Sequence, residues 1–360
     1  MPLGPGHQRL AIWTFSASGN SYTDRSIEAR SVGGTGFPIF STSADFLYIG
    51  LEDRFDMAIF LLSTNGAVGN RSWFYYDGDT WNAFSPTIEY DFTSNGAEKF
   101  ERLNNWRELL FTSTVPHAAT PPDNITRYWI RCSVASVTTA PVVNQIIVRE
   151  YAAYATSSDV AKTLQLNYDF ASDTIPTKNT VEDYIHNAQS KIDYETRKSW
   201  RPNIVIDEEH DYIRPGFALV NNYPTQLLRL QIWNGGGYDT KTEGRGNDYF
   251  LVPEIGMVYY SRFFNLPARI QAYSGGAPWG EFSFSVRVSY IYGSNVYNER
   301  EGGIVNDMAK KLAALDVLQN HDYSLIIPSG ADRISLERKS DLWRAEIEEN
   351  LARLQSFEIF

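Results

Sequence analysis

Hydrophobic periodicity changes near residue 156, and this change limits the fold more than any other feature of the sequence. Between residues 40 and 155 the apolar residues stand in short runs bounded by turn or charged residues, without a sustained helical period. Beyond residue 156, apolar residues recur at helical spacing in several segments. The pattern predicts an α+β chain, in which an antiparallel β-sandwich is followed by a helical domain with an inserted β-hairpin or small sheet.

Strand signals dominate the amino-terminal half. Residues 127–136 alternate apolar and polar side chains, which predicts a half-exposed strand. Asp77 and Gly78 stand between two aromatic stretches and tolerate the positive φ angles of a type I′ turn, so we expect a hairpin over residues 72–84. The turn-rich residues 1–40 are expected to form an extended arm. Other strand candidates along the chain are residues 45–51, 56–63, 142–151, 226–233, 249–261 and 282–293.

The segment NTVEDYIHNAQSKIDYETRKSW, residues 179–200, predicts an amphipathic helix with a marked start. Its apolar residues fall on one helical face and are Val181, Ile185, Ala188 and Ile192. Asn179 is a good N-cap, and Glu182 three residues later completes the pattern of a capping box. A shorter helix is expected over residues 157–166.

Two further helical stripes lie near the carboxyl terminus. The first consists of Ile304, Met308, Leu312, Leu315 and Leu318, and the second of Trp343, Ile347, Leu351 and Leu354. After the second stripe, residues 356–360 form a tail with three hydrophobic side chains, Phe357, Ile359 and Phe360. Because so short a segment cannot fold on itself, the tail predicts a partner surface.

Composition and motifs point away from several classes of function. A net charge of −11 makes the whole chain a poor ligand for a phosphate backbone. No apolar run approaches the roughly 20 residues that span a bilayer, so no membrane contact is expected. The single cysteine, Cys132, has apolar neighbours and is expected to be buried, and the acidic residues 206–212 are expected to form a solvated loop. No catalytic motif is found, so we expect no enzyme activity, no cofactor and no metal.

Four stretches beyond residue 156 carry a family likeness. They are VEDYIHNAQSKIDYETRKSWRP, SVRVSYIYGSN, EREGGIVNDMAKKLAALDVL and SLERKSDLWRAEIEENL. Their order and spacing resemble the head-to-tail adaptor proteins of tailed bacteriophages, also called connector or head-completion proteins. One departure concerns the segment NVYNEREGG, which stands where the family commonly has a proline before the helix.

A second set of motifs lies in the predicted sandwich. It comprises Tyr48-Ile49-Gly50, Phe55, Trp73-Phe74-Tyr75-Tyr76-Asp77-Gly78, Trp81, Asp91-Phe92-Thr93, Trp106 and Tyr128-Trp129-Ile130-Arg131. This set resembles a β-domain of phage tail, baseplate and neck proteins, usually an accessory domain and sometimes discussed as sugar-binding. The chain is accordingly divided into an arm (1–40), an accessory sandwich (41–155), an adaptor domain (156–355) and a tail (356–360).

The adaptor resemblance implies a virion structural protein that is assembled in the host cytoplasm and located in the head–tail neck. Its copies would form a ring, typically of about twelve subunits, that joins the portal to tail or neck proteins. Double-stranded DNA would pass through the centre of the ring. The residues expected at the ring and portal interface are Tyr184, Trp200, Trp343, Ile347, Leu351, Leu354, Phe357, Ile359 and Phe360. The alternative that stays open is a carbohydrate-binding virion or surface protein that acts through the β-sandwich.

Overall fold

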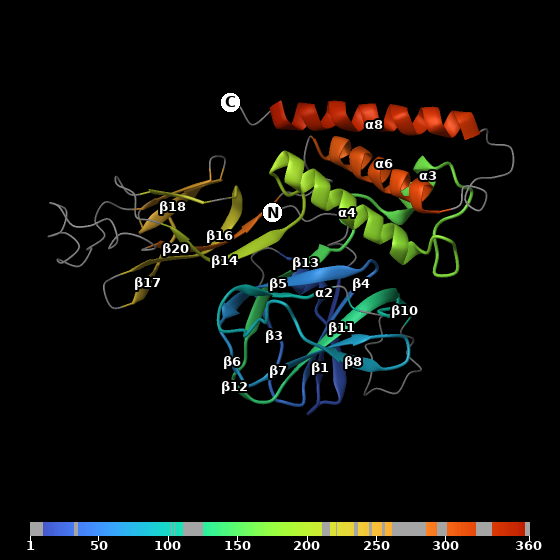
Figure 1. The fold of residues 1–360 in the computed structure, drawn as a ribbon. Coiled ribbons are helices and arrows are strands. Elements are labelled where there is room, and N and C mark those ends of the chain that lie inside the picture. The colour runs from blue at the N-terminus through green and yellow to red at the C-terminus, as the bar shows by residue number, and fades with distance from the viewer. Residues whose placement is uncertain are drawn as a thin grey trace, which may run out of the picture. The chain divides into compact units, whose positions relative to one another are not determined.

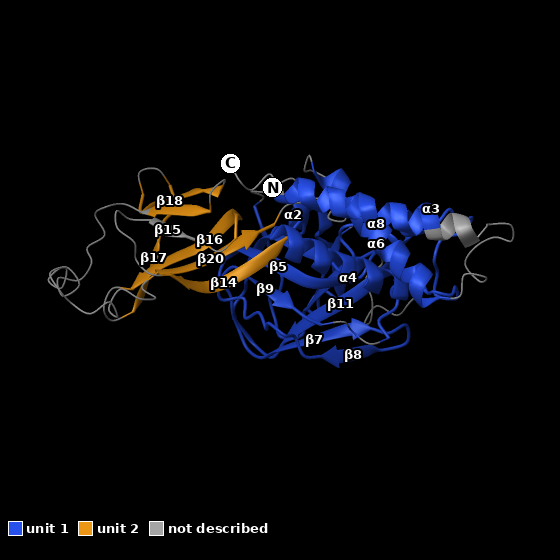
Figure 2. Ribbon diagram, turned by 45° about the horizontal axis from the view of Figure 1, so that its top comes forward, with its two compact units in different colours: residues 1–201, 295–360 blue, residues 202–294 orange. Residues whose placement is uncertain are grey.

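The secondary structure of the computed structural model confirms the predicted α+β class. Antiparallel sheets come first in the sequence, and helices with an interposed four-stranded antiparallel sheet follow (Figure 1). The chain forms two compact units, residues 1–201 with 295–360 (unit 1) and residues 202–294 (unit 2; Figure 2). The structure describes residues 10–31, 35–101, 103, 105–110, 125–210, 217–220, 222–233, 237–244, 247–253, 256–260, 286–293, 301–321 and 333–356.

Two antiparallel sheets form the sandwich-like part of unit 1. The larger sheet has the order β2-β1-β4-β11-β7-β8 with β10 beside β11, and the smaller has the order β3-β13-β5-β9. The larger sheet consists of β1 (Ala11–Ser16), β2 (Ser21–Asp24), β4 (Phe46–Leu51), β7 (Arg71–Tyr76), β8 (Trp81–Phe84), β10 (Leu109–Leu110) and β11 (Thr126–Val134). The smaller consists of β3 (Phe37–Pro38), β5 (Phe55–Thr64), β9 (Gly96–Lys99) and β13 (Val142–Glu150). The short elements beside them are α2 (Ser26–Arg30) and the paired strands β6 (Ala67–Val68) and β12 (Val137–Thr139).

The pairing of β7 with β8 confirms the hairpin predicted from the sequence, but the turn is not of type I′, because Gly78 is the one residue of 77–80 with a positive φ. Asp77 accepts hydrogen bonds from the backbone N–H groups of Asp79 and Thr80, at 2.9 and 2.8 Å. Gly78 has a φ of +108°, which glycine adopts without the strain that a Cβ would bring. The Asp-Gly pair therefore fixes the turn.

The amino-terminal segment differs from the extended arm expected over residues 1–40. Its described part contributes β1, β2, α2 and β3 to the sandwich, and its apolar side chains are buried there. These buried side chains are Leu10, Ile12, Ala29, Phe37, Ile39 and Phe40. The glycine-rich and serine-rich composition reflects the turns between these short elements.

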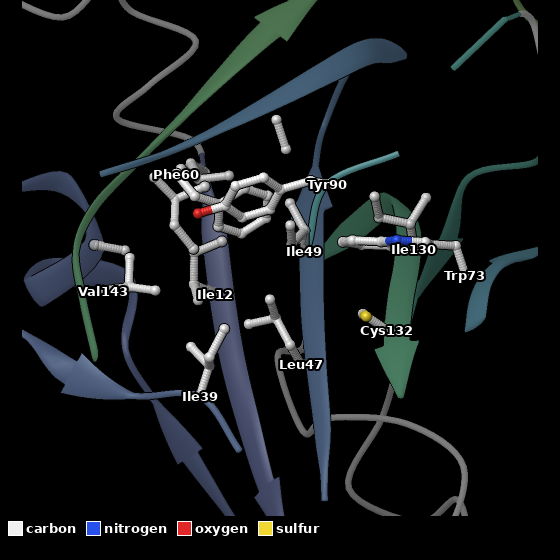
Figure 3. Close-up of a cluster of buried hydrophobic side chains, with 14 of the residues drawn as sticks. Ile12, Ile39, Leu47, Ile49, Phe60, Trp73, Tyr90, Ile130, Cys132 and Val143 are labelled. Carbon is white, nitrogen blue, oxygen red and sulfur yellow. The ribbon is translucent and has the colours of Figure 1, made fainter. Parts of the chain in front are cut away.

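The hydrophobic core of the sandwich lies between the two sheets. Figure 3 shows side chains of the larger sheet, such as Ile49 and Ile130, together with Phe60 and Val143 of the smaller sheet. The Phe60 and Tyr90 rings are stacked with their centroids 4.9 Å apart. Because each large apolar side chain contributes about 1.5–3 kcal/mol when fully buried, this cluster stabilises the sandwich more than any surface contact does.

Strand β11 has the predicted alternation, but its outer face is more covered than expected, because Arg127 and Trp129 are buried there while Arg131 and Ser133 are partly exposed. Tyr128, Ile130 and Cys132 face the core. Trp129 is fully buried on the opposite face, where a Cβ on Gly50 of the neighbouring strand would lie 2.6 Å from its ring. Aromatic side chains from other strands cover Trp129. The hydrophobic periodicity of β11 alone gives no information about these neighbours.

Helices form the rest of the described part of unit 1, and the three predicted helical stripes are confirmed. The helices are α3 (Ser157–Thr163), α4 (Lys178–Thr196), α6 (Gly302–Asn320) and α8 (Arg333–Ser356). Figure 1 shows α4, α6 and α8 as one layer, and their stripes meet in a shared hydrophobic cluster. We call these three helices the helical layer.

Helix α4 begins differently from the prediction. Its N-cap is Thr177, whose hydroxyl accepts a hydrogen bond from the backbone N–H of Thr180 at 3.3 Å. Asn179 and Glu182, expected to form a capping box, instead contact the sandwich. The capping prediction was wrong because tertiary contacts engage both side chains.

A buried arginine joins the sandwich to α4. Arg54, between β4 and β5, is 5% exposed, and its Nε lies 2.5 Å from Oε2 of Glu182, which is 3% exposed. The Arg54 Nη2 donates hydrogen bonds to the carbonyl of Asn179 at 2.8 Å and to Asp183 Oδ1 at 3.1 Å. The guanidinium also lies over the ring of Tyr151, 4.7 Å from its centroid. We call this group of contacts the junction.

Three further contacts hold the first turns of α4 against the sandwich. Lys178 Nζ lies 2.6 Å from Glu108 Oε1. The Tyr128 hydroxyl donates to Asn179 Oδ1 at 3.2 Å. The ring of His186 stacks on Tyr151 with the centroids 4.1 Å apart. Together with Arg54, these contacts fix the direction in which α4 leaves the sandwich.

Unit 2 contains two antiparallel sheets, with the orders β14-β20-β16-β17 and β15-β19-β18. Their strands are β14 (Asn203–His210), β15 (Phe217–Leu219), β16 (Pro224–Trp233), β17 (Tyr238–Lys241), β18 (Tyr249–Val252), β19 (Met257–Tyr260) and β20 (Val286–Tyr292). The acidic residues expected in a loop at 206–212 lie mainly on β14. There Asp207, Glu208 and Glu209 accept contacts from Arg229, His210 and Arg287, respectively. Arg229 lies on β16 and Arg287 on β20, while His210 lies on β14 itself, and this pairing explains why the carboxylates are tolerated in a sheet.

The sandwich core also contains a carboxyl group, that of Glu98 on β9. Glu98 is fully buried, and its Oε2 accepts a hydrogen bond from the backbone N–H of Tyr90 at 2.8 Å. Burial raises the pKa of Glu98 from 4.5 to about 8, although the Tyr90 N–H opposes this rise. The side chain is therefore protonated in the folded protein at neutral pH, because its charged form is poorly solvated there.

The junction predicts coupled effects of two substitutions. Arg54→Met or Glu182→Leu alone should lower the free energy of unfolding by roughly 3–5 kcal/mol, because each removes the nearest partner of a buried charge. The double variant should lose clearly less than the sum. Urea denaturation of all three variants measures this coupling. Arg353→Ala removes an exposed ion pair with Glu349 and should change stability by less than about 1 kcal/mol. Single junction variants as stable as this control would contradict the assignment.

Glu98 predicts a loss of stability at high pH. Its folded pKa of about 8 exceeds the unfolded value of 4.5, so its proton favours the folded state below pH 4.5. This contribution falls as the pH rises and is lost above pH 8, with a change on the order of 5 kcal/mol. Glu98→Gln should remove this dependence of stability on pH, because a glutamine side chain does not titrate. Its amide oxygen can still accept the hydrogen bond from the Tyr90 N–H. Urea denaturation at pH 5, 7 and 9 tests this, with the exposed Glu101→Gln as control. An unchanged pH profile in Glu98→Gln would refute it.

Candidate functional site

The predicted interface residues of the helical layer pack within the chain itself. Trp343, Ile347 and Leu354 on α8 are 5–6% exposed, and Leu351 is partly buried beside them. Trp200 is buried in the same cluster. Their burial accounts for the hydrophobic stripes, so in this structure these side chains support the fold of one copy.

Tyr184 and the carboxy-terminal tail complete the predicted set. Tyr184 is partly buried, and its hydroxyl lies 3.1 Å from Nε2 of His321 at the end of α6. Phe357, Ile359 and Phe360 lie outside the described residues. The docking of the tail therefore stays a prediction.

Other apolar side chains of the helical layer are exposed. Tyr194 on α4 is 81% exposed, and Leu342 on α8 is 57% exposed. The side-chain amide of Gln355 donates to the carbonyl of Glu195 at 2.9 Å, which places the end of α8 beside Tyr194. Leu342 lies about 20 Å away along α8, at about 1.5 Å per residue. The layer thus exposes two separate apolar points.

An aromatic surface covers the outer side of the larger sandwich sheet. Directly paired residues share one face of a sheet, and the register pairs Trp13 with Tyr48, Tyr48 with Arg131, and Arg131 with Phe74. Tyr76 is paired with Trp81 at the other edge, with their ring centroids 5.3 Å apart. We call this surface the aromatic face, and its partly exposed aromatic side chains are Trp13, Phe15, Tyr22, Phe46, Phe74, Tyr76 and Trp81.

Arg131 lies among the rings of the aromatic face. Its Cζ is 4.5 Å from the ring centroid of Trp81 and 5.0 Å from those of Phe46 and Phe74. Among the residues that the structure describes, no carboxylate oxygen approaches its guanidinium within 4.0 Å. The sandwich arginines that do pair with carboxylates include Arg54, Arg71, Arg127 and Arg149. Arg131 therefore keeps an unneutralised charge in a partly buried place.

Polar groups accompany the rings of the aromatic face. Burial raises the pKa of the Tyr48 hydroxyl, and the neighbouring Tyr22 and Arg131 oppose the rise. The phenol therefore stays protonated at neutral pH and remains a hydrogen-bond donor. The Tyr48 hydroxyl is buried beneath the face, so the surface itself combines flat aromatic rings with the partly exposed Arg131 guanidinium, which suits an amphipathic ligand.

Sequence reasoning did not identify the aromatic face as a site. A signal was present, because Trp13 and Phe15, Phe46 and Tyr48, and Phe74 and Tyr76 are aromatic pairs spaced by two. Such spacing places both members of a pair on one face of a strand. What the sequence did not reveal was that these strands are neighbours in one sheet.

The described residues hold few groups suited to catalysis. Cys132 is fully buried, as expected, and burial raises the pKa of its thiol well above the usual value. Within the described ranges, no three His, Cys, Asp or Glu side chains are arranged to hold a metal ion. No helix in the described part of the chain is long and apolar enough to cross a membrane. The aromatic face and the exposed points of the helical layer are therefore the surfaces on which function can be argued.

Comparison with known proteins leaves the family open. No protein-family model matches this chain, and no curated protein matches it. The likeness to phage adaptors and to the phage β-domain therefore rests on the motifs in the sequence.

Proposed function

We propose that the protein is a ring-forming structural component of a tailed-phage neck, which joins the portal to the tail around the DNA conduit. The observation that carries this proposal is the chain order of α4, an inserted sheet, α6 and α8. The four stretches that resemble phage adaptors supply α4, β20, α6 and α8 in that order. The likeness therefore follows the elements of the fold, which scattered chance matches would not do.

A closed ring requires two different surfaces on each copy, because every subunit contacts its neighbours in a head-to-tail manner. The exposed Tyr194 and Leu342 offer two such points on the helical layer, about 20 Å apart. We assign them to the contacts between neighbouring subunits. The tail residues Phe357, Ile359 and Phe360 remain the proposed contact with the portal.

The aromatic face supports a second candidate function, carbohydrate binding. A sugar ring presents C–H groups on its faces and hydroxyl groups at its edge. It can therefore stack on partly exposed rings such as Trp81 while its hydroxyls meet the partly exposed Arg131 guanidinium. This function uses the sandwich and leaves the helical layer free, so one chain can carry both functions.

The ring proposal predicts that two exposed side chains control assembly. Tyr194→Ser or Leu342→Ser should raise the concentration at which rings form on portal particles of the same virus by about tenfold or more, because each removes roughly 1.5–3 kcal/mol of apolar burial per contact. Native mass spectrometry and negative-stain electron microscopy measure ring formation. Ile27→Ser is the matched control, since Ile27 is 73% exposed on α2 in the sandwich. A wild-type chain that stays monomeric with portal present would count decisively against the ring.

The carbohydrate proposal predicts that the rings of the aromatic face are needed for binding. On an array of bacterial surface polysaccharides, the full chain should bind at least one glycan. Trp81→Ala should bind it about tenfold more weakly, the loss expected when an aromatic contact of about 1.4 kcal/mol disappears. Ile88→Ala, which alters a 41% exposed side chain elsewhere in the sandwich, should bind like wild type. Equal binding by the Trp81 variant would exclude this face.

A further inference from the structure

We propose that the aromatic face binds an acidic polysaccharide, and that Arg131 is the residue that selects sugars carrying a carboxylate. This inference rests on the second proposed function, carbohydrate binding by the same face. The inference adds to that function the negative charge of the sugar and the residue that binds this charge.

The first argument is the unneutralised charge of Arg131. Within the described residues its guanidinium has contacts with the rings of Phe46, Phe74 and Trp81 and has no carboxylate within 4.0 Å. A chain with a net charge of −11 has many carboxylates available, and arginines elsewhere in the sandwich pair with them. A guanidinium that is partly removed from water and not paired attracts an anionic ligand strongly.

The second argument is the preorganisation of the side chain. Arginine loses much rotamer freedom when it binds an anion, and this loss weakens binding. The flanking rings already restrain Arg131, since guanidinium groups stack favourably on aromatic faces. A carboxylate can therefore be bound with a smaller entropy loss than at a free surface arginine.

The third argument concerns the acidic residues near the face. Asp24, on the edge strand β2, accepts hydrogen bonds from the N–H and hydroxyl of Ser26. Asp77 is engaged in the β7–β8 turn. Both carboxylates accept these local hydrogen bonds, and neither lies within 4.0 Å of the Arg131 guanidinium.

Other occupants fit the face less well. A nucleic acid requires several cations along its phosphates, whereas the described residues place Arg131 among the aromatic rings and pair its neighbour Arg127 with Glu52. A second copy related by a two-fold axis would bring the same patch, and hence a second Arg131, against the first. An acidic sugar meets both demands of the surface, because its ring stacks on an aromatic side chain and its carboxylate forms two hydrogen bonds to the guanidinium.

Matched acidic and neutral glycans test the inference on the full chain. The probes are oligomers of galacturonate, mannuronate, hyaluronate and sialate, each beside its methyl ester, which has the same sugar ring without the charge. We expect at least one acidic oligomer to bind more than tenfold tighter than its ester. This preference should decline as salt rises from about 50 to 500 mM, because a partly exposed charge pair is screened.

Variants of Arg131 assign the preference to this residue. Arg131→Gln should reduce the preference for the acid about tenfold to a hundredfold, the range expected for a charge-assisted hydrogen-bond pair. Arg131→Lys should keep part of it, because lysine retains the charge but not the planar fork. Arg71→Gln is the control, since Arg71 lies in the same sheet and is already paired with Glu89. Thermal unfolding of each variant shows whether the fold is kept.

The possible outcomes distinguish a failure of this inference from a failure of carbohydrate binding itself. Binding of neutral glycans that depends on Trp81, without any preference for acids, overturns the inference and leaves carbohydrate binding standing. An acid preference that persists in Arg131→Gln also overturns it, and so does a wild-type preference that does not respond to salt. If no glycan of either kind binds, both the inference and carbohydrate binding by this face are wrong.

Discussion

The buried ion pair between Arg54 and Glu182 is the interaction on which unit 1 depends. Both side chains are 5% exposed or less, so neither charge is solvated if the other is removed. The pair connects the turn between β4 and β5 to the first turns of α4, which are 128 residues apart in sequence. The Tyr151–His186 stack and the Lys178–Glu108 pair lie around it. Sandwich and helical layer are thereby fixed to each other by contacts that favour one arrangement, since apolar packing alone is not directional.

The division of the surfaces follows from this arrangement. The side chains on the inner side of the larger sheet pack in the sandwich core. The apolar stripes of α4, α6 and α8 pack against one another in the hydrophobic cluster of the helices. Partly exposed aromatic rings are left on the outer side of the sheet, with Trp129 packed against Gly50 beneath them. The proposed ring and glycan contacts lie on these remaining surfaces, in different parts of unit 1. Neither requires the core of the chain to rearrange.

Many motif residues that carried the family likeness have structural tasks. Trp73 belongs to the sandwich core, Asp77 and Gly78 form a turn, and the indole N–H of Trp106 donates to the carbonyl of Trp129 at 3.1 Å. Such residues indicate a fold and do not by themselves indicate a ligand.

The interface residues expected on α8 are buried within the chain for a related reason. A stripe of apolar residues at helical spacing indicates that the side chains are buried, but it does not indicate whether this chain or a partner buries them.

The sequence by itself determined the elements and their class. Period-two runs, the Asp77-Gly78 turn and the helical stripes are local patterns, and local backbone preferences are enough to predict β4, β5, the β7–β8 hairpin, α4, α6 and α8. Only the tertiary structure decided that Asn179 and Glu182 face the sandwich, that Trp129 is buried, and that Arg131 meets three rings from three other strands. These contacts join residues far apart in the chain. They depend on which strands become neighbours, and hydrophobic periodicity within one segment carries no information about that choice.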